Sequence, residues 1–268
     1  MWKLAFCPRF SCKSVIVILV MVQLLLFIAG LIYTGAAVGT LNEIFFLGLQ
    51  WETLQRFGMR MPWLIHDSYE IHRLLLSPLL HFGFSHFVIC VLLQTIVGSL
   101  VESVIGSLRL VILYFLVGIG SSLFACICTD NYGVGSEVFV YGMLASLFAM
   151  LLTYWPRMGE AFCPKICAIL MLVFAVVVVV MLLTMSATTY TKILAISHIS
   201  YPDVFAGIGG FIVGLLSSLW MMPSVEGNKR TMREQILFLS GIIGSVIFFV
   251  VVILVFAFAS PKEYWRIE

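Results

Sequence analysis

Charged residues are scarce in this 268-residue sequence: they make up 10% of the chain, against about 25% in an average soluble domain. Apolar residues make up 62%, above the roughly 45–50% of soluble proteins, and the mean hydropathy is +1.13. This composition excludes a soluble domain and predicts an integral membrane protein. The net charge of +2 is small and the basic residues are scattered, which excludes nucleic acid as a main partner.

The seven cysteines lack the paired spacing of a disulfide framework or a zinc site. Cys7 and Cys12 lie beside basic residues before the first apolar run, a setting that suits reversible palmitoylation although no motif specifies it. The cysteines in or at the edge of apolar runs are expected to pack as small hydrophobic side chains. They are Cys90, Cys126, Cys128 and Cys167.

Long apolar runs are abundant, and seven of them approach the length of about 20 residues that crosses a bilayer as a helix. The runs are Ser14–Gly35, Pro78–Glu102, Leu108–Cys128, Val134–Trp155, Cys163–Met185, Asp203–Met222 and Ile236–Ser260. Since lipid-exposed segments other than helices and closed barrels leave backbone groups unsatisfied, the sequence predicts an all-α polytopic membrane protein. The first run is longer than the apolar core of a signal peptide, so we interpret it as a retained signal anchor.

Lys and Arg are unevenly divided between the two ends of the predicted spans. Nine lie on the side of the N-terminus and six on the other, which predicts a cytosolic N-terminus and a lumenal or external C-terminus. The connection after the first span, residues 36–77, is rich in aromatic side chains. We therefore expect residues 45–64 to lie sideways in the outer membrane interface, with a shallow water-accessible cavity on the non-cytosolic side.

Ionisable side chains within the predicted spans are candidates for function, because they are costly to place in hydrocarbon. These residues are His81, His86, Glu102, Glu137 and Asp203. His81 and His86 are five residues apart, about 140° around a helix, so they do not share a face. This spacing is poor for chelation and no other His or Cys is expected to cluster nearby, so the sequence predicts no metal site, while interfacial or hydrogen-bonded packing histidines remain an open alternative.

The segment from His72 to His86 reads HRLLLSPLLHFGFSH and resembles the entry to the second helix of the rhomboid intramembrane proteases. A series of Gly, Glu, Gly, Arg and Tyr residues leading into the third helix of that family is matched as well. Its members here are Gly98, Glu102, Gly106, Arg109 and Tyr114. The resemblance covers residues 44–222 and implies a six-helix rhomboid-like core, followed by a seventh span as in many eukaryotic secretory-pathway members.

Rhomboid proteases use a Ser–His dyad, and the resemblance locates its positions in this chain. Counting from Tyr141-Gly142, the nucleophile position holds Glu137, and the base position in the sixth helix holds Gly207. The two oxyanion positions hold His86 and Cys90, the latter where the family has Asn. The resemblance therefore implies that the catalytic dyad is lost.

Ser136, next to the nucleophile position, is a displaced candidate nucleophile. A shift of one residue turns a helical side chain by about 100°, and a serine without a base is a weak nucleophile. The sixth span offers no histidine, since His198 precedes Gly207 by nine residues, about 13 Å along a helix axis. The remaining family residues are expected to be structural, with small residues letting the fourth and sixth spans approach closely. These structural family residues are Arg73, Gly98, Glu102, Gly106, Arg109, Gly142, Gly210 and Gly214.

Three functions compete. The first is a catalytically inactive pseudoprotease that binds transmembrane client proteins, with His81, His86 and Glu137 as binding candidates, and affects their trafficking, assembly or degradation. The second is an active intramembrane serine endopeptidase with a displaced site. The third is a transporter or channel with Glu137 and Asp203 along its pathway, although no inverted repeat supports it.

The preferred interpretation divides the chain into three parts. Residues 1–43 hold the cytosolic N-terminus and first span, 44–222 the interfacial loop and the rest of the core, and 223–268 a cytosolic loop, the seventh span and a short tail. The expected partners are client proteins and the lipid bilayer, with no cofactor, metal or nucleic acid. The expected location is a membrane of the secretory pathway: endoplasmic reticulum, Golgi or plasma membrane.

Overall fold

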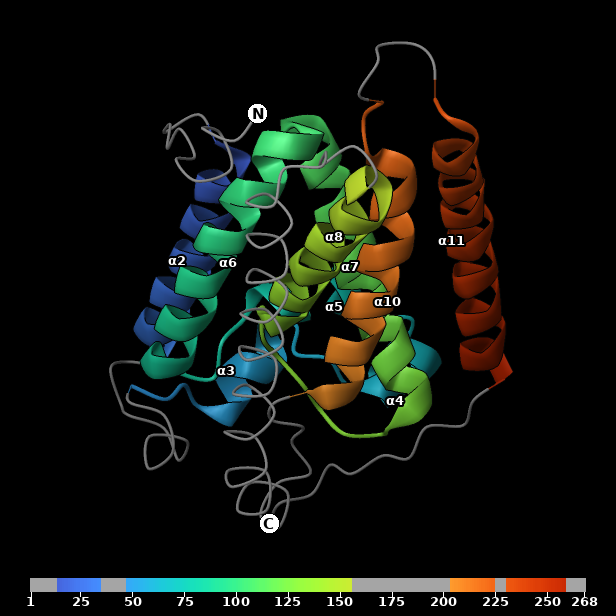
Figure 1. Ribbon diagram of the computed structural model, residues 1–268. Helices are drawn as coiled ribbons and strands as arrows, with labels where there is room; N and C mark the ends of the chain where they lie inside the picture. The colour runs from blue at the N-terminus through green and yellow to red at the C-terminus, as the bar shows by residue number, and fades with distance from the viewer. Residues whose placement is uncertain (1–13, 35–46, 156–202, 225–229, 259–268) are drawn as a thin grey trace.

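The computed structural model describes residues 14–34, 47–155, 203–224 and 230–258, which form a bundle of long helices (Figure 1). Six helices in these ranges are long and apolar enough to cross a membrane. They are α2 (Val15–Tyr33), α6 (Phe84–Ile105), α7 (Ser107–Cys128), α8 (Glu137–Tyr154), α10 (Val204–Met221) and α11 (Met232–Phe258). The prediction of an all-α, multi-pass membrane protein is confirmed in the described part of the chain. The predicted fifth span, Cys163–Met185, lies outside the described residues.

Helix α8 occupies the middle of the bundle, and most of its residues are buried. Helices α7 and α10 lie beside it, α2 and α6 form one side, and α11 stands at the opposite edge (Figure 1). Most of α11 faces outward with large apolar side chains, as expected for a helix in contact with lipid.

Glycines bring α8 and α10 into backbone contact. A Cβ atom on Gly214 would lie 2.5 Å from the Cα atom of Gly142, and one on Gly210 would lie 2.7 Å from the carbonyl oxygen of Val138. Next to this contact, the hydroxyl of Ser218 donates a hydrogen bond of 2.6 Å to the hydroxyl of Ser146. Only glycine allows the two helices to be this close.

The carboxylate of Glu102, near the end of α6, caps the beginning of α2. It accepts hydrogen bonds from the backbone N–H groups of Val15 (2.9 Å) and Ile16 (3.3 Å), and from the hydroxyl of Ser14. The first N–H groups of a helix have no partner within it and attract negative charge. Gly98, one turn earlier on α6, leaves room for Ile16, whose Cδ1 atom would lie 2.5 Å from a Cβ atom there.

Three polar side chains link α2, α6 and α7 within the spans. The amide of Gln23 donates to the hydroxyl of Tyr114 (2.5 Å) and to the amide oxygen of Gln94 (3.2 Å), while the amide of Gln94 donates to Tyr114 (3.3 Å). All three side chains are buried. In lipid such groups hold helices together through hydrogen bonds, because water is not available as an alternative partner.

The connection between α2 and α6 folds back beneath the bundle as short helices. These are α3 (Trp51–Arg56), α4 (Pro62–Asp67), α5 (Arg73–Leu76) and the 3-10 turn η2 (Ser77–Leu79). Leu49, Leu54, Met59 and Met61 pack in a protein core, while Trp51 is partly buried against it. Much of the apolar surface that suggested an interfacial segment is thus buried within the protein.

Arg73, the first residue of α5, stabilises the conformation of this connection. Its guanidinium donates to the backbone carbonyl groups of Gln55 (2.8 Å) and Met59 (2.9 Å) and pairs with Glu70 at 2.6 Å. A planar, always charged donor is suited to several fixed carbonyl acceptors at once.

A buried ion pair between Arg60 and Asp203 joins the connection to the start of α10. The backbone of Arg60 also pairs with that of Gly133 in the loop before α8. The N–H of each residue donates to the carbonyl oxygen of the other, with nitrogen–oxygen distances of 3.0 and 3.2 Å. Asp203 precedes α10 and accepts from the backbone N–H of Ala206 at 3.0 Å, so it caps that helix as well. Three segments distant in sequence meet at this pair.

Replacing Gly214 with alanine is expected to destabilise the protein by about 1–3 kcal/mol, because the added methyl group would meet the backbone of Gly142. Thermal unfolding of the purified protein in detergent measures the effect. Gly244→Ala in α11 is the matched control, since its nearest neighbour is the end of the Leu216 side chain, which can move. Equal unfolding temperatures for the two variants would contradict the close contact.

Replacing Arg60 with methionine should cost about 3–5 kcal/mol, because it leaves the Asp203 carboxylate buried without its counter-charge. The double variant Arg60→Met with Asp203→Asn should be more stable than Arg60→Met alone, as the amide oxygen still caps α10. Arg56→Met, at an exposed arginine of the same connection, is the control. Chemical denaturation of the wild type, Arg60→Met, Asp203→Asn, the double variant and the control measures this coupling, and additive effects of the two single changes would refute it.

Candidate functional site

The positions that the resemblance assigns to the catalytic residues lie at the end of the bundle where α6, α8 and α10 begin. Glu137 is the first residue of α8, and Ser136 is its N-cap. The preceding Gly135 has a φ of +145°, and a Cβ atom there would lie 2.5 Å from the Cδ atom of Glu137. A glycine is therefore required on both backbone and steric grounds for the Glu137 side chain to occupy this place.

The carboxylate of Glu137 points toward α6. Its Oε2 atom lies 3.1 Å from Nε2 of His86 and 4.0 Å from Sγ of Cys90. All three side chains are almost fully buried, with about 3% of each residue exposed. The other carboxylate oxygen of Glu137, Oε1, has no hydrogen-bond partner among the described residues.

Ser136 points to a different histidine. Its hydroxyl lies 2.8 Å from Nε2 of His81, in the segment just before α6, and both residues are fully buried. Burial lowers the pKa of His81 well below its usual range, and the neighbouring His86 lowers it further. The rings of His81 and His86 meet edge to face, with centroids 5.3 Å apart. The two histidines thus lie together but serve different partners.

Gly207, at the family's base position on α10, lies against α8. A Cβ atom there would approach the Cε2 atom of Tyr141 to 2.9 Å. Tyr141 follows Glu137 by one helical turn, so the nucleophile and base positions belong to the facing surfaces of α8 and α10. The Tyr141 ring takes up the room that a larger residue at position 207 would need.

A narrow cavity lies beside Glu137 and is also lined by Gly135, Arg60 and Asp203. Its volume is about 10 Å³, roughly the space of one water molecule. Asp203 is neutralised by Arg60 rather than facing an open pathway. Within the described residues, this geometry does not support a conducting route along Glu137 and Asp203.

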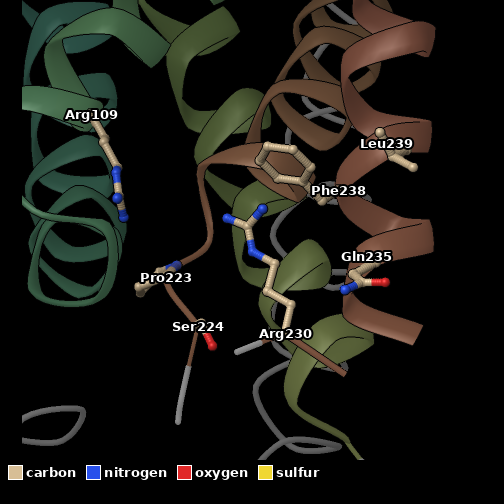
Figure 2. A pocket seen from close by; sticks show the side chains of 7 residues that line it. All are labelled: Arg109, Pro223, Ser224, Arg230, Gln235, Phe238 and Leu239. Atoms are coloured by element: carbon tan, nitrogen blue, oxygen red, sulfur yellow. The ribbon is translucent and has the colours of Figure 1, made fainter. Parts of the chain in front are cut away.

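Another cavity, of about 630 Å³, lies at the opposite end of the bundle. Figure 2 shows Arg109, near the start of α7, and Arg230, just before α11, among its lining residues. The guanidinium carbon of Arg230 lies 3.7 Å from the centre of the Phe238 ring. Gly106 ends α6 with a φ of +85°, close in sequence to Arg109. This cavity is remote from the catalytic positions of the family.

Two features of the site follow from contacts between distant parts of the chain. Cys90 joins His86 and Glu137, and the three ligand-type atoms lie within 4.8 Å of one another. The prediction that no other His or Cys clusters near His81 and His86 is wrong, because Cys90 lies beside His86. The i,i+4 spacing of His86 and Cys90 is the signal in the sequence that could have shown this. Arg60, the partner of Asp203, has no such local signal.

Comparison with known proteins identifies a Rhomboid domain over residues 68–224. The chain is 32% identical over 174 residues to Inactive RHOMBOID-like protein 8 of Arabidopsis thaliana, covering 65% of this chain and 44% of that protein. It is 27% identical over 222 residues to Rhomboid-like protease 2 of Toxoplasma gondii, covering 82% and 70%.

Inactive rhomboid protein 1 of Danio rerio is 28% identical over 170 residues, covering 62% of this chain and 17% of that protein. The chain thus spans less than half the length of two of these three relatives. Relatives named as proteases and relatives named as inactive both match it. Because the Rhomboid domain accounts for more than half of the sequence and the described helices agree with it, this protein belongs to the rhomboid family.

Proposed function

We propose that this protein is a catalytically inactive rhomboid that binds transmembrane client proteins and affects their trafficking, assembly or degradation. The observation that carries the proposal is the pairing of Glu137 with His86 at 3.1 Å, opposite a glycine at position 207. A carboxylate held by a histidine takes the place of a hydroxyl nucleophile, and Tyr141 fills the place of the base. Hydrolysis of an amide in the family's manner needs both groups.

The loss of chemistry is combined with a preserved scaffold. The contact of α8 with α10, the Glu102 cap and the Arg60–Asp203 pair are independent of a nucleophile or base. Relatives named as inactive give a precedent for the scaffold without the reaction. We place the protein in a membrane of the secretory pathway with its N-terminus in the cytosol, on the basis of the Lys and Arg distribution.

A second candidate function is supported by one contact, the 2.8 Å approach of Ser136 Oγ to His81 Nε2. A hydroxyl beside an imidazole is the arrangement of a nucleophile and its general base. Two properties oppose it: both groups are fully buried, and the lowered pKa of His81 makes it a weak base. We therefore prefer the inactive protein.

The protein is expected to produce no cleavage of a transmembrane substrate that a dyad-bearing rhomboid cuts, a difference of at least about 10⁴-fold in rate. Product formation in proteoliposomes measures it. Glu137→Ser alone should also be inactive, because members of a catalytic unit fail together. Turnover is expected only when Glu137→Ser is combined with Gly207→His, with Cys90→Asn as a further addition and Tyr141 displaced from the new histidine.

Ser136→Ala separates the two candidate functions. Should the wild-type protein cleave and Ser136→Ala abolish cleavage, the Ser136–His81 pair is a working dyad and the protease function is correct. His81→Gln should then abolish cleavage too, whereas His66→Gln, at a histidine paired with Asp67 outside the site, should not.

Client binding is tested by a photo-crosslinking amino acid placed at Val88, which is 42% exposed on α6 and lies between His86 and Cys90 in sequence. In native membranes it should capture intact transmembrane proteins more efficiently than the same probe at Val251, which is 50% exposed on α11. The reason is that a client at the altered site must pass this part of α6. Equal capture at both positions would show that Val88 faces lipid and not a client. Capture of cleaved fragments would indicate proteolysis.

A further inference from the structure

His86, Cys90 and Glu137 together form a compact group of metal-binding side chains. His86 and Cys90 are four residues apart on α6 and therefore share one face of that helix. Glu137 faces them from the first turn of α8, and one ligand atom from each residue lies within 4.8 Å of the others. All three residues are at least nine-tenths buried, and Glu137 Oε1 has no hydrogen-bond partner within the described ranges.

We propose that His86, Cys90 and Glu137 bind a Zn²⁺ ion at the altered catalytic site. Zinc binds nitrogen and oxygen at about 2.0–2.2 Å and sulfur at about 2.3 Å, so neighbouring ligand atoms of a tetrahedral site are roughly 3.3–3.7 Å apart. Glu137 Oε2 lies 3.1 Å from the His86 nitrogen and 4.0 Å from the Cys90 sulfur. These two distances bracket the tetrahedral values, and the third pair, the His86 nitrogen and the Cys90 sulfur, lies within 4.8 Å. Binding one ion therefore requires the side chains to move closer together.

The donor set favours zinc over the harder divalent cations. A thiolate and an imidazole suit Zn²⁺, whereas Mg²⁺ and Ca²⁺ prefer oxygen ligands only. The thiolate of Cys90 and the carboxylate of Glu137 carry two negative charges, which balance the charge of the ion. A neutral complex is favourable here because all three ligand residues are buried, where an uncompensated charge is costly.

The ring of His86 has a suitable orientation. Its Nε2 atom faces Glu137, and the ring stacks on Phe82 with centroids 5.7 Å apart. Zinc on Nε2 places the ring proton on Nδ1, which in the present structure accepts from the backbone N–H of Phe82 at 3.4 Å. Two donors would then face each other, so zinc binding requires the His86 ring and the Phe82 N–H to move apart from this long contact.

Three protein ligands leave a fourth position for water or another small ligand. The bound ion would join α6 to α8 where a rhomboid protease has its nucleophile. This inference goes beyond the proposed function and does not depend on it, because zinc binding is measured without any client and without any reaction.

The test uses the full-length protein, purified in detergent and stripped of metal with a chelator. Competition with a zinc-sensitive dye should give close to one tightly bound Zn²⁺ per chain, and Co²⁺ should give a tetrahedral spectrum with a cobalt–thiolate charge-transfer band. Cys90→Ser should remove that band. Cys90→Ser and Glu137→Gln should each weaken zinc binding by more than about 100-fold, since even changes behind the ligands weaken it 10–100-fold.

Two matched controls complete the design. Cys126→Ser removes a buried cysteine of α7 outside the trio, and His66→Gln removes a histidine paired with Asp67. Both should bind zinc as the wild type does. Zinc should also raise the unfolding temperature of the wild type and of both controls but not that of Cys90→Ala, which tests the site even if another ligand variant fails to fold. A wild type without tight zinc binding, or a cobalt–thiolate band that persists in Cys90→Ser, would overturn the proposal.

Discussion

The backbone contact between α8 and α10 is the constraint on which the rest of the described bundle depends. Apolar side chains are as stable in lipid as against another helix, so no hydrophobic effect drives helices together within a membrane. They associate instead through close packing and hydrogen bonds. The approach of Gly214 to Gly142 supplies that packing and fixes how far one helix is shifted along the other. The same shift sets Gly207 beside Tyr141 and brings the start of α10, with Asp203, to Arg60.

The interactions that hold the scaffold are separate from those that a protease would need. The glycines and the Ser146–Ser218 hydrogen bond lie within the bundle, whereas Glu137 and His86 lie at its end. A carboxylate in this buried place needs a compensating partner, because an isolated charge is costly in a medium of low dielectric constant. His86 is close enough to meet that need. A histidine at this position thus has an electrostatic role that does not depend on any reaction.

The helices could be predicted from hydropathy because each crossing depends on a local property, about 20 consecutive apolar residues. The predicted first run, Ser14–Gly35, and the observed Val15–Tyr33 differ by two residues or fewer at each end. The second helix begins at Phe84 rather than Pro78, since Pro78 lies in a 3-10 turn and Gly83 is extended. Hydropathy does not detect this interruption before α6, because the residues on both sides of it are apolar.

The side-chain contacts of the candidate site could not be predicted in the same way, since they join residues far apart in sequence. Glu137 was identifiable as a buried charge, but its contact with Cys90 spans 47 residues, and that of Ser136 with His81 spans 55. Family resemblance gave the positions of the altered residues without their partners. The division of the two histidines between Glu137 and Ser136 depends on the turn before α6, which no periodicity encodes.

The Glu102 cap has a consequence for the order of assembly. The N–H group of Val15, at the start of α2, finds its acceptor 87 residues later in the chain. During synthesis the first helix therefore enters the membrane with its leading amides dependent on water or lipid headgroups. They obtain a permanent acceptor only when the end of α6 has returned to the same face. Helix α2 is thus completed only after α6 has been made, and an insertion machinery that holds α2 until α6 arrives would shield those amides in the meantime.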